Sequence, residues 1–305
     1  MNNQIKGIEL VWLSRTDLTN MNSGEGGTNF VDVKKYKKNG IEYPYVSGQA
    51  MRHYLRAAVR RELPTSQFMC LPNDDGEGCG DEKKCINCDL FGYMHTIRGT
   101  GAQVRVSPVK VSPAMGLLPM DDNSTIDFLT RKKFKSEEEK ASGDIVNVEL
   151  GVNTYKCGIS IDLVRVGAKE EANDESRTLV IKPVIDDDAK KKRVTNLLTA
   201  IMIISDYSKQ SRLLTDFAPD ILLGSVQERY SHRLQKALEI DRDGNLKIER
   251  FEAIVQEMKG YCDVYFGILP GILSNESDVK TKVTSLGLEI LTPGDVIKKL
   301  IGKLN

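Results

Sequence analysis

The sequence predicts an α+β fold in which helices cover one side of a sheet. Segments rich in Val, Ile and Tyr, typical of strands, alternate in irregular order with segments of helical periodicity. The chain of 305 residues is 40% hydrophobic and 28% charged, a composition typical of a globular protein with a sizeable core. It excludes a wholly disordered chain. The length allows two domains, or one domain with large insertions.

The expected strands show no fixed repeat period. They occupy residues 7–15, 28–36, 41–46, 102–112, 146–166, 179–185 and 261–269. Three stretches rich in Gly, Pro, Asp, Glu and Ser interrupt them, and we interpret these as insertions into a single domain, 1–305. They are a cysteine-rich finger at 64–95 and flexible or thumb-like segments at 113–145 and 168–178.

The clearest helix is expected at residues 48–61. Ser47 is suited to cap its first turn, and Pro64 follows its end. Apolar residues at helical spacing predict further helices at 188–205, 225–238, 249–259 and 293–300.

Charge and hydropathy limit where the protein acts. The 43 Lys and Arg residues balance 43 Asp and Glu residues, which argues against a protein that is basic overall but allows a local basic groove. The longest apolar runs, such as residues 201–204, are too short to span a membrane. Residues 1–4 lack the features of a signal peptide. We therefore expect a cytoplasmic protein without a membrane partner.

Four of the six cysteines fall close together, with the spacing C-x8-C-x5-C-x2-C. They are Cys70, Cys79, Cys85 and Cys88. A C-x2-C pair and two further thiolates complete a tetrahedral zinc site, and glycines between them let the backbone fold back sharply. With four sulfur ligands such a zinc is structural. An iron–sulfur cluster and free thiols remain alternatives, whereas disulfides are disfavoured in the cytosol.

The helix expected at 48–61 carries a basic face. Arg52, Arg56 and Arg60 recur every four residues, with Gln49 and His53 beside them, opposite an apolar stripe. Arginine forks match phosphate geometry, although a surface helix with solvated arginines would give the same pattern.

Three loops add donors suited to a sugar–phosphate backbone. The first, at 18–29, reads LTNMNSGEGGTN; the second, at 97–101, contains Arg98; the third, at 208–212, reads SKQSR. Together with the basic helix face, these segments predict a groove for a polyanion.

Enzyme signatures are scarce. The three histidines do not pair at metal-ligand spacing, and neither a dinucleotide fingerprint nor a Walker sequence occurs. A nuclease using Asp17, Glu25 or Asp32 remains an alternative.

Three segments together resemble a known family: the loop LTNMNSGEGGTN, the stretch YPYVSGQAMR at 43–52, and Lys209-Gln210 followed by Leu-Thr-Asp at 214–216. The chain resembles the CRISPR-associated backbone subunit of type I Cascade complexes, the Cas-seven family, in particular its DevR branch. The similarity covers roughly residues 5–60, 95–165 and 195–270. It implies an RNA-recognition-motif-like, ferredoxin-like palm with inserted fingers and a hairpin thumb.

The resemblance also implies a function. Copies would stack head to tail along crRNA, together with other Cascade subunits. The guide would pair with target nucleic acid, and the complex would act in antiviral defence. Its guide-binding residues fall on Asn20, Asn22, Ser23, Gln49, Arg52, Arg56, Lys209, Gln210 and Arg212. We expect binding without catalysis, since the aspartate with which type III relatives cut RNA has no clear match. The rivals are a type III-like RNA endonuclease and a zinc-bearing DNA-binding regulator.

Overall fold

The structure is a computed structural model. It describes residues 5–23, 30–74, 76–97, 99, 101–132, 143–173, 177–207 and 213–304.

Two long antiparallel strands form the centre of a large mixed sheet. β1 (Gly7–Thr19) pairs with β10 (Gly143–Asp162) from Gly7 opposite Asp162 to Trp12 opposite Cys157 and beyond. The sheet continues on the β1 side through β13 (Ile221–Gln227), β14 (Cys262–Ile268) and β15 (Ile290–Leu291). On the β10 side it continues through β8 (Ala114–Gly116), β4 (Ile41–Val46) and β3 (Lys35–Lys38). β2 (Phe30–Val31), β7 (Val109–Val111) and β9 (Ser124–Lys132) also pair with β10.

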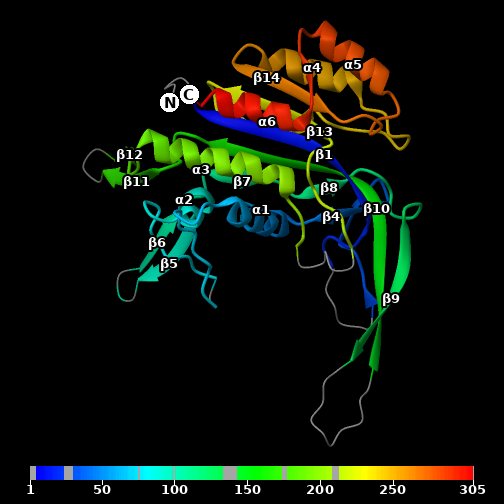
Figure 1. The fold of residues 1–305 in the computed structure, drawn as a ribbon, viewed down its shortest axis with the longest axis horizontal. Helices are drawn as coiled ribbons and strands as arrows, with labels where there is room; N and C mark the ends of the chain where they lie inside the picture. Colours follow the sequence, from blue (N-terminus) through cyan, green and yellow to red (C-terminus); the bar gives the residue numbers. More distant parts are fainter. Residues whose placement is uncertain are drawn as a thin grey trace, which may run out of the picture.

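Helices lie on both faces of this sheet, so the expectation of a sheet covered on one side is wrong. The helices are α1 (Gly48–Glu62), α2 (Ile86–Phe91), α3 (Asp187–Ala200), α4 (Ile248–Met258), α5 (Glu276–Ser285) and α6 (Pro293–Gly302), with short 3-10 turns at Ile201–Ile203 and Leu234–Lys236. Side chains of α1, α3 and α6 share one buried cluster with Leu10 and Trp12 of β1, and those of α4 and α5 share another with Val11 and Leu13. Figure 1 shows α4 and α5 above the sheet and α1 and α3 below it.

The alternation along β1 explains this arrangement. Successive strand residues point to opposite faces of a sheet, and the buried run from Ile8 to Leu13 supplies apolar side chains to both. A strand that is buried on both faces has no polar side to mark it in the sequence. The mixed α+β class is confirmed.

One expected helix is wrong. Residues 225–238 were predicted as helical, but the first of them form the end of β13, and the 3-10 turn at Leu234–Lys236 follows. β13 lies between β1 and β14 and is buried along its whole length. The other predicted helices are confirmed. The one predicted at 188–205 is α3, which is followed by the 3-10 turn at Ile201–Ile203.

The expected insertions contain regular structure. Residues 64–95 include α2 and the start of the strand β5 (Tyr93–Ile97), which forms a hairpin with β6 (Gly101–Arg105). Residues 168–178 include β11 (Ala168–Asn173), paired with β12 (Thr178–Pro183). Residues 113–145 include β8 and β9, and β9 with β10 forms a long hairpin that projects away from the helices (Figure 1).

In the part of the chain that the structure describes, every helix is too short or too polar to cross a membrane.

Candidate nucleic-acid interface and metal centre

Helix α1 positions the predicted basic face. Ser47 caps it as expected, its side chain accepting a hydrogen bond from the Ala50 amide at 3.2 Å. The inward stripe is also confirmed: Met51, Tyr54, Leu55 and Ala58 are all buried in the main core. Because this stripe fixes the rotation of the helix, the opposite face must carry the arginines.

Arg52 and Arg56 are not freely solvated on that face. Both are half-buried, and their guanidinium groups lie over the ring of Phe91, with centroid distances of 5.6 and 5.2 Å. Arg52 also donates to the Phe91 carbonyl. Burial, followed by repulsion from Arg56, lowers the pKa of Arg52 to about 10. Arg52 therefore stays charged at neutral pH, in a fixed position.

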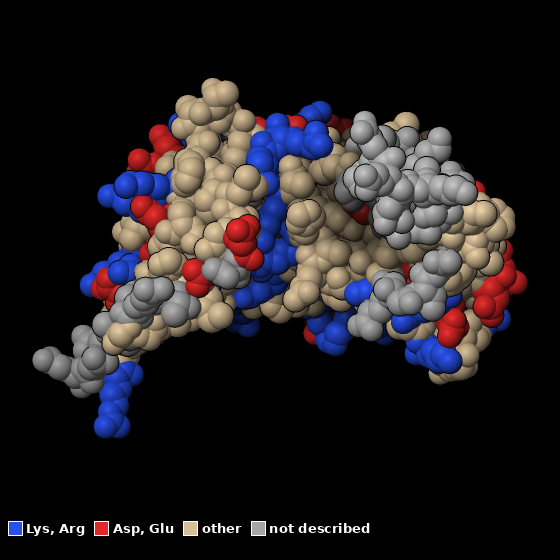
Figure 2. Space-filling view, turned by 90° about the horizontal axis from the view of Figure 1, so that it is seen from below, with Lys and Arg blue, Asp and Glu red and all other residues tan. Residues whose placement is uncertain are grey.

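The cationic side chains form a continuous surface feature. α1 carries Arg52, Arg56, Arg60 and Arg61. Figure 2, which views the molecule from below, shows Lys and Arg side chains gathered in a band across the underside, where Figure 1 draws α1. Gln49 and His53 are the exposed members of the predicted set on this helix. A band of positive charge attracts a polyanion.

The first polar loop is joined to the start of α1. Oδ1 of Asn22 accepts a hydrogen bond from the Ser47 amide at 3.0 Å, which places Asn22 at the helix N-terminus. Ser23 donates to Oδ1 of Asn20 at 3.2 Å. Asn22 and Ser23 are half-buried, so polar atoms of this loop lie beside the basic helix face.

Asn20 differs from its neighbours. It is only 1% exposed, and its Nδ2 donates to the carbonyl oxygens of Glu149 at 3.0 Å and Asp32 at 3.3 Å. These bonds attach the loop to β10. The Asn20 side chain therefore positions the loop and is not on the surface that an RNA strand would contact.

Tyr54 connects α1 to two distant segments. Its hydroxyl lies 2.6 Å from the Met21 carbonyl oxygen and 3.1 Å from Oδ2 of Asp206. Burial, and then the nearby Asp206 carboxylate, raise the pKa of Tyr54, so the hydroxyl remains protonated. Arg61 lies over the ring of Tyr207 at 3.9 Å. The segment that leads to the third predicted loop thus packs on α1.

The remaining predicted contacts fall outside the described residues. They are Arg98, Lys209, Gln210 and Arg212.

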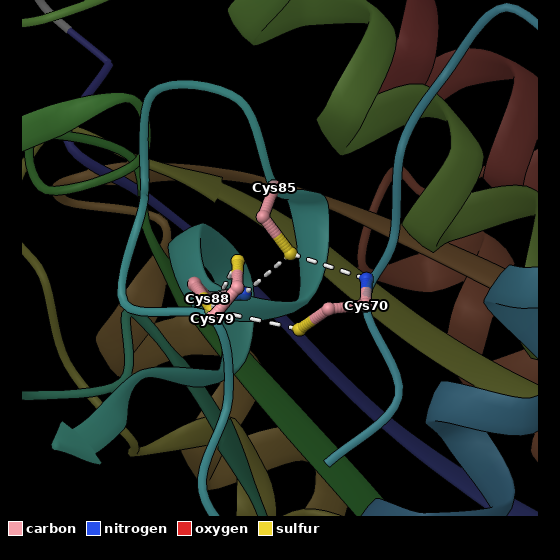
Figure 3. Close-up of side chains that lie close together, drawn as sticks. All are labelled: Cys70, Cys79, Cys85 and Cys88. Carbon is pink, nitrogen blue, oxygen red and sulfur yellow. Dashed lines mark hydrogen bonds between the residues drawn. The ribbon is translucent and has the colours of Figure 1, made fainter. Parts of the chain in front are cut away.

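The four cysteines predicted as a metal site come together. The Sγ atoms of Cys70, Cys79, Cys85 and Cys88 all lie within 4.8 Å of one another. Figure 3 shows the four side chains close together. Cys70 and Cys79 lie 3.7 and 3.6 Å from the Cys88 sulfur. Four thiolates around zinc at about 2.3 Å would be roughly 3.8 Å apart, so the geometry fits a tetrahedral site.

Local backbone geometry favours a thiolate at Cys85. Cys85 Sγ accepts from the amides of Cys70 at 3.3 Å and Cys88 at 3.5 Å. A hydrogen bond from the Cys88 thiol and these amides lower the pKa of Cys85 to about 4. A hydrogen bond to Cys85, followed by burial, raises the pKa of Cys88, and burial raises the pKa of Cys79. Gly78 approaches so closely that a Cβ there would lie 2.9 Å from Cys88 Sγ. The described cysteines are all free thiols.

A buried carboxylate that the sequence did not reveal attaches this segment to the core. Asp89 is fully buried and bonds Arg105 at 2.6 Å and Arg193 at 2.7 Å. It also accepts from the Gly167 amide at 2.9 Å. Arg193 belongs to the basic run 190–193, whose other members are lysines. Its partner is 104 residues away, so spacing in the sequence gave no signal.

Comparison with known proteins decides the family. Residues 14–227 match the model of the family described as "CRISPR-associated negative auto-regulator DevR/Csa2". The chain belongs to the DevR/Csa2 family of CRISPR-associated proteins. The match confirms the resemblance found in the sequence. Among curated proteins, none matches.

Solved structures share the fold of this DevR/Csa2 family member. One similar chain belongs to a "CRISPR RNA-guided surveillance complex", with 13% identity and a TM-score of 0.60. Another belongs to a "CRISPR RNA-guided surveillance complex, pre-nicking", with 13% identity and a TM-score of 0.62. Each similarity covers 98% of this chain and 100% of the other. At this identity the likeness shows the fold alone.

Proposed function

We propose that this DevR/Csa2 family member is a crRNA-binding backbone subunit of a type I Cascade-like complex. It polymerises head to tail along the guide and acts in antiviral defence without catalysis. The family match and the fold shared with chains of RNA-guided surveillance complexes support the proposal. In this proposal, the central sheet with α1 corresponds to the RNA-recognition-motif-like palm. The guide pairs with target nucleic acid, and other subunits flank the filament.

The observation that carries the proposal is the half-buried arginine face of α1. Arg52 and Arg56 are held against Phe91, so little side-chain entropy remains to be lost when they bind phosphates. Asn22 and Ser23 lie at the start of the same helix. Phosphate contacts position a strand without reading its bases, which suits a subunit that must accept any guide sequence.

The β9–β10 hairpin is the proposed contact between copies. It exposes large apolar side chains, with Ile126 at 54%, Phe128 at 68% and Ile145 at 59%. Large exposed apolar groups often mark protein–protein interfaces. The projection of this hairpin from the body (Figure 1) lets it reach a neighbouring subunit.

We assign structural zinc to the four-cysteine centre. The sulfur spacing and the amide donors suit a tetrahedral thiolate site, and four protein ligands leave no position open for a catalytic water. The metal then stabilises the finger that packs beside α1.

The direct test is RNA binding by the full chain with both arginines removed. Arg52→Gln with Arg56→Gln should weaken the affinity for short single-stranded RNAs of different sequence by about the same factor, at least tenfold, since charge-assisted contacts are each worth about 1.5–3 kcal/mol. Lys280→Gln with Lys282→Gln removes two charges from α5, on the opposite face of the sheet, and should have little effect.

Two other outcomes would point elsewhere. Unchanged RNA affinity in the arginine variant would refute the site. Preferential binding of one duplex DNA sequence would instead favour a transcription regulator, and Mg²⁺-dependent cuts in target RNA would favour a nuclease.

A further inference from the structure

A pocket of about 340 Å³ lies between the arginine face of α1 and the four-cysteine segment. Arg52 and Arg56 line it from α1, Gly78 and Asn87 from the cysteine segment, and Met94 from β5. The pocket lies where two features that the sequence suggested separately, the basic helix face and the cysteine cluster, come together.

One wall of the pocket carries an unused acceptor. Asn87 is 2% exposed, yet its Oδ1 atom has no hydrogen-bond partner within the described part of the chain. Its Nδ2 donates to Cys70 Sγ at 3.4 Å. This bond orients the amide, since the rotated form would place oxygen against an electron-rich sulfur. Buried acceptors of this kind are normally satisfied, so a ligand with a donor group fits here.

The arginines of α1 add an unused donor to the pocket lining. The Nε atom of Arg56 is buried and without a partner among the described residues. Arg52 and Arg56 are four residues apart on α1 and both line the pocket, so two cations lie side by side there. Paired arginines suit an anion with several oxygens, above all a phosphate. A ribose-phosphate unit carries both complementary groups: a phosphate anion for the arginines and a hydroxyl that can donate to the Asn87 acceptor.

We propose that this pocket binds one ribose-phosphate unit of the guide RNA. The phosphate lies on Arg52 and Arg56, and the ribose 2′-hydroxyl donates to Asn87 Oδ1. The inference rests on the proposed function and adds that the cysteine segment forms part of the RNA site. The volume lies within the usual range of small-ligand pockets. The 2′-hydroxyl is the group that distinguishes RNA from DNA, so the cysteine segment would contribute this selectivity.

The first test places a carboxylate at the pocket rim. Met94 is 63% exposed, so Met94→Glu should fold normally. We expect it to weaken binding of short single-stranded RNA about tenfold by repelling the phosphate. Leu179→Glu is the matched control, because Leu179 is 56% exposed, belongs to the separate β11–β12 hairpin and does not line the pocket. It should change the affinity less than twofold.

The second test examines Asn87 directly. An RNA with 2′-fluoro groups keeps the ribose pucker but cannot donate from the 2′ position. Wild type should bind the natural RNA about threefold to tenfold more tightly than the fluorinated one, and Asn87→Ala should reduce this ratio. Zinc content, measured in parallel, shows whether the cysteine centre of the variant is intact.

The outcomes separate this inference from the proposed function. If wild type binds RNA but Met94→Glu and Leu179→Glu behave alike, or Asn87→Ala keeps the full ratio, the pocket assignment is overturned and the guide-binding role stands. If wild type binds no RNA, the proposed function fails, and the pocket assignment fails with it.

Discussion

The hydroxyl of Tyr54 on α1 lies 3.1 Å from the carboxylate of Asp206, deep between two segments that are 152 residues apart. The same hydroxyl contacts the Met21 carbonyl at 2.6 Å. One buried phenol therefore connects the first polar loop, the basic helix and the segment leading to residues 208–212. These are three of the four parts of the chain on which the predicted RNA contacts fall; the fourth is the loop at 97–101.

Tyr54→Phe tests this connection. Removing the hydroxyl leaves the Met21 carbonyl without this donor and should lower the free energy of unfolding by about 1–3 kcal/mol. It should also weaken RNA binding, because the loops lose a shared support. Urea denaturation and an RNA titration measure the two effects.

Tyr36→Phe provides the comparison for Tyr54→Phe. The Tyr36 hydroxyl donates to the Gly116 carbonyl at 3.0 Å, a bond that joins β3 to β8 and involves no residue of α1. Tyr36→Phe should lower the free energy of unfolding by about 1 kcal/mol and leave the RNA affinity unchanged. If the two variants bound RNA equally well, Tyr54 would have no role in arranging the site.

Asp89→Asn tests the attachment of the cysteine segment. The change leaves Arg105 and Arg193, each under 10% exposed at the side chain, without a full countercharge. Breaking a buried ion pair from one side typically costs about 3–5 kcal/mol, and we expect a loss of this size in chemical denaturation.

The matched control for Asp89→Asn is Glu257→Gln. It breaks the exposed pair between Glu257 and Arg233, whose atoms are 2.7 Å apart, and should cost less than about 1 kcal/mol. A loss for Asp89→Asn no larger than for this control would mean that the buried pair does not hold the finger.

Metal analysis tests the four-cysteine centre. The purified chain should contain close to one zinc per molecule, and Cys85→Ser should lose it together with thermal stability, since metal binding and local folding are coupled. Cys262→Ser should keep both, because Cys262 lies outside the cluster and its Sγ donates to the Met258 carbonyl at 3.1 Å, a bond that serine can replace. A metal-free, fully stable protein, or one containing iron, would contradict the zinc assignment.

Local features of the sequence were sufficient for α1 and the cysteine centre. The Ser47 cap, the apolar stripe and the C-x2-C pair each depend on residues close together in the chain, so spacing predicts their geometry. The strand β13 was missed because Gly224 and Ser225 interrupt its apolar run, and burial on both faces leaves no alternation of polar and apolar residues to mark the strand.

Contacts between residues far apart in the chain could not be predicted from the sequence, and the site depends on several of them. Asp89 finds Arg193 across 104 residues, and in the sequence alone that arginine is indistinguishable from the solvated lysines beside it. Asn20 resembled a surface donor, yet its amide is used by backbone carbonyls of β10 and of residue 32. The pocket beside Asn87 likewise exists only because α2 and α1 pack together through Phe91.

The dependence of RNA affinity on salt tests the central claim most directly. Each phosphate neutralised on a single strand contributes about −0.7 to the slope of log K against log salt concentration. Arg52→Gln with Arg56→Gln should therefore make the slope shallower by about 1.4, whatever the base sequence, while Lys280→Gln with Lys282→Gln leaves it unchanged. An identical slope in the arginine variant and wild type would show that the α1 face does not hold the RNA backbone.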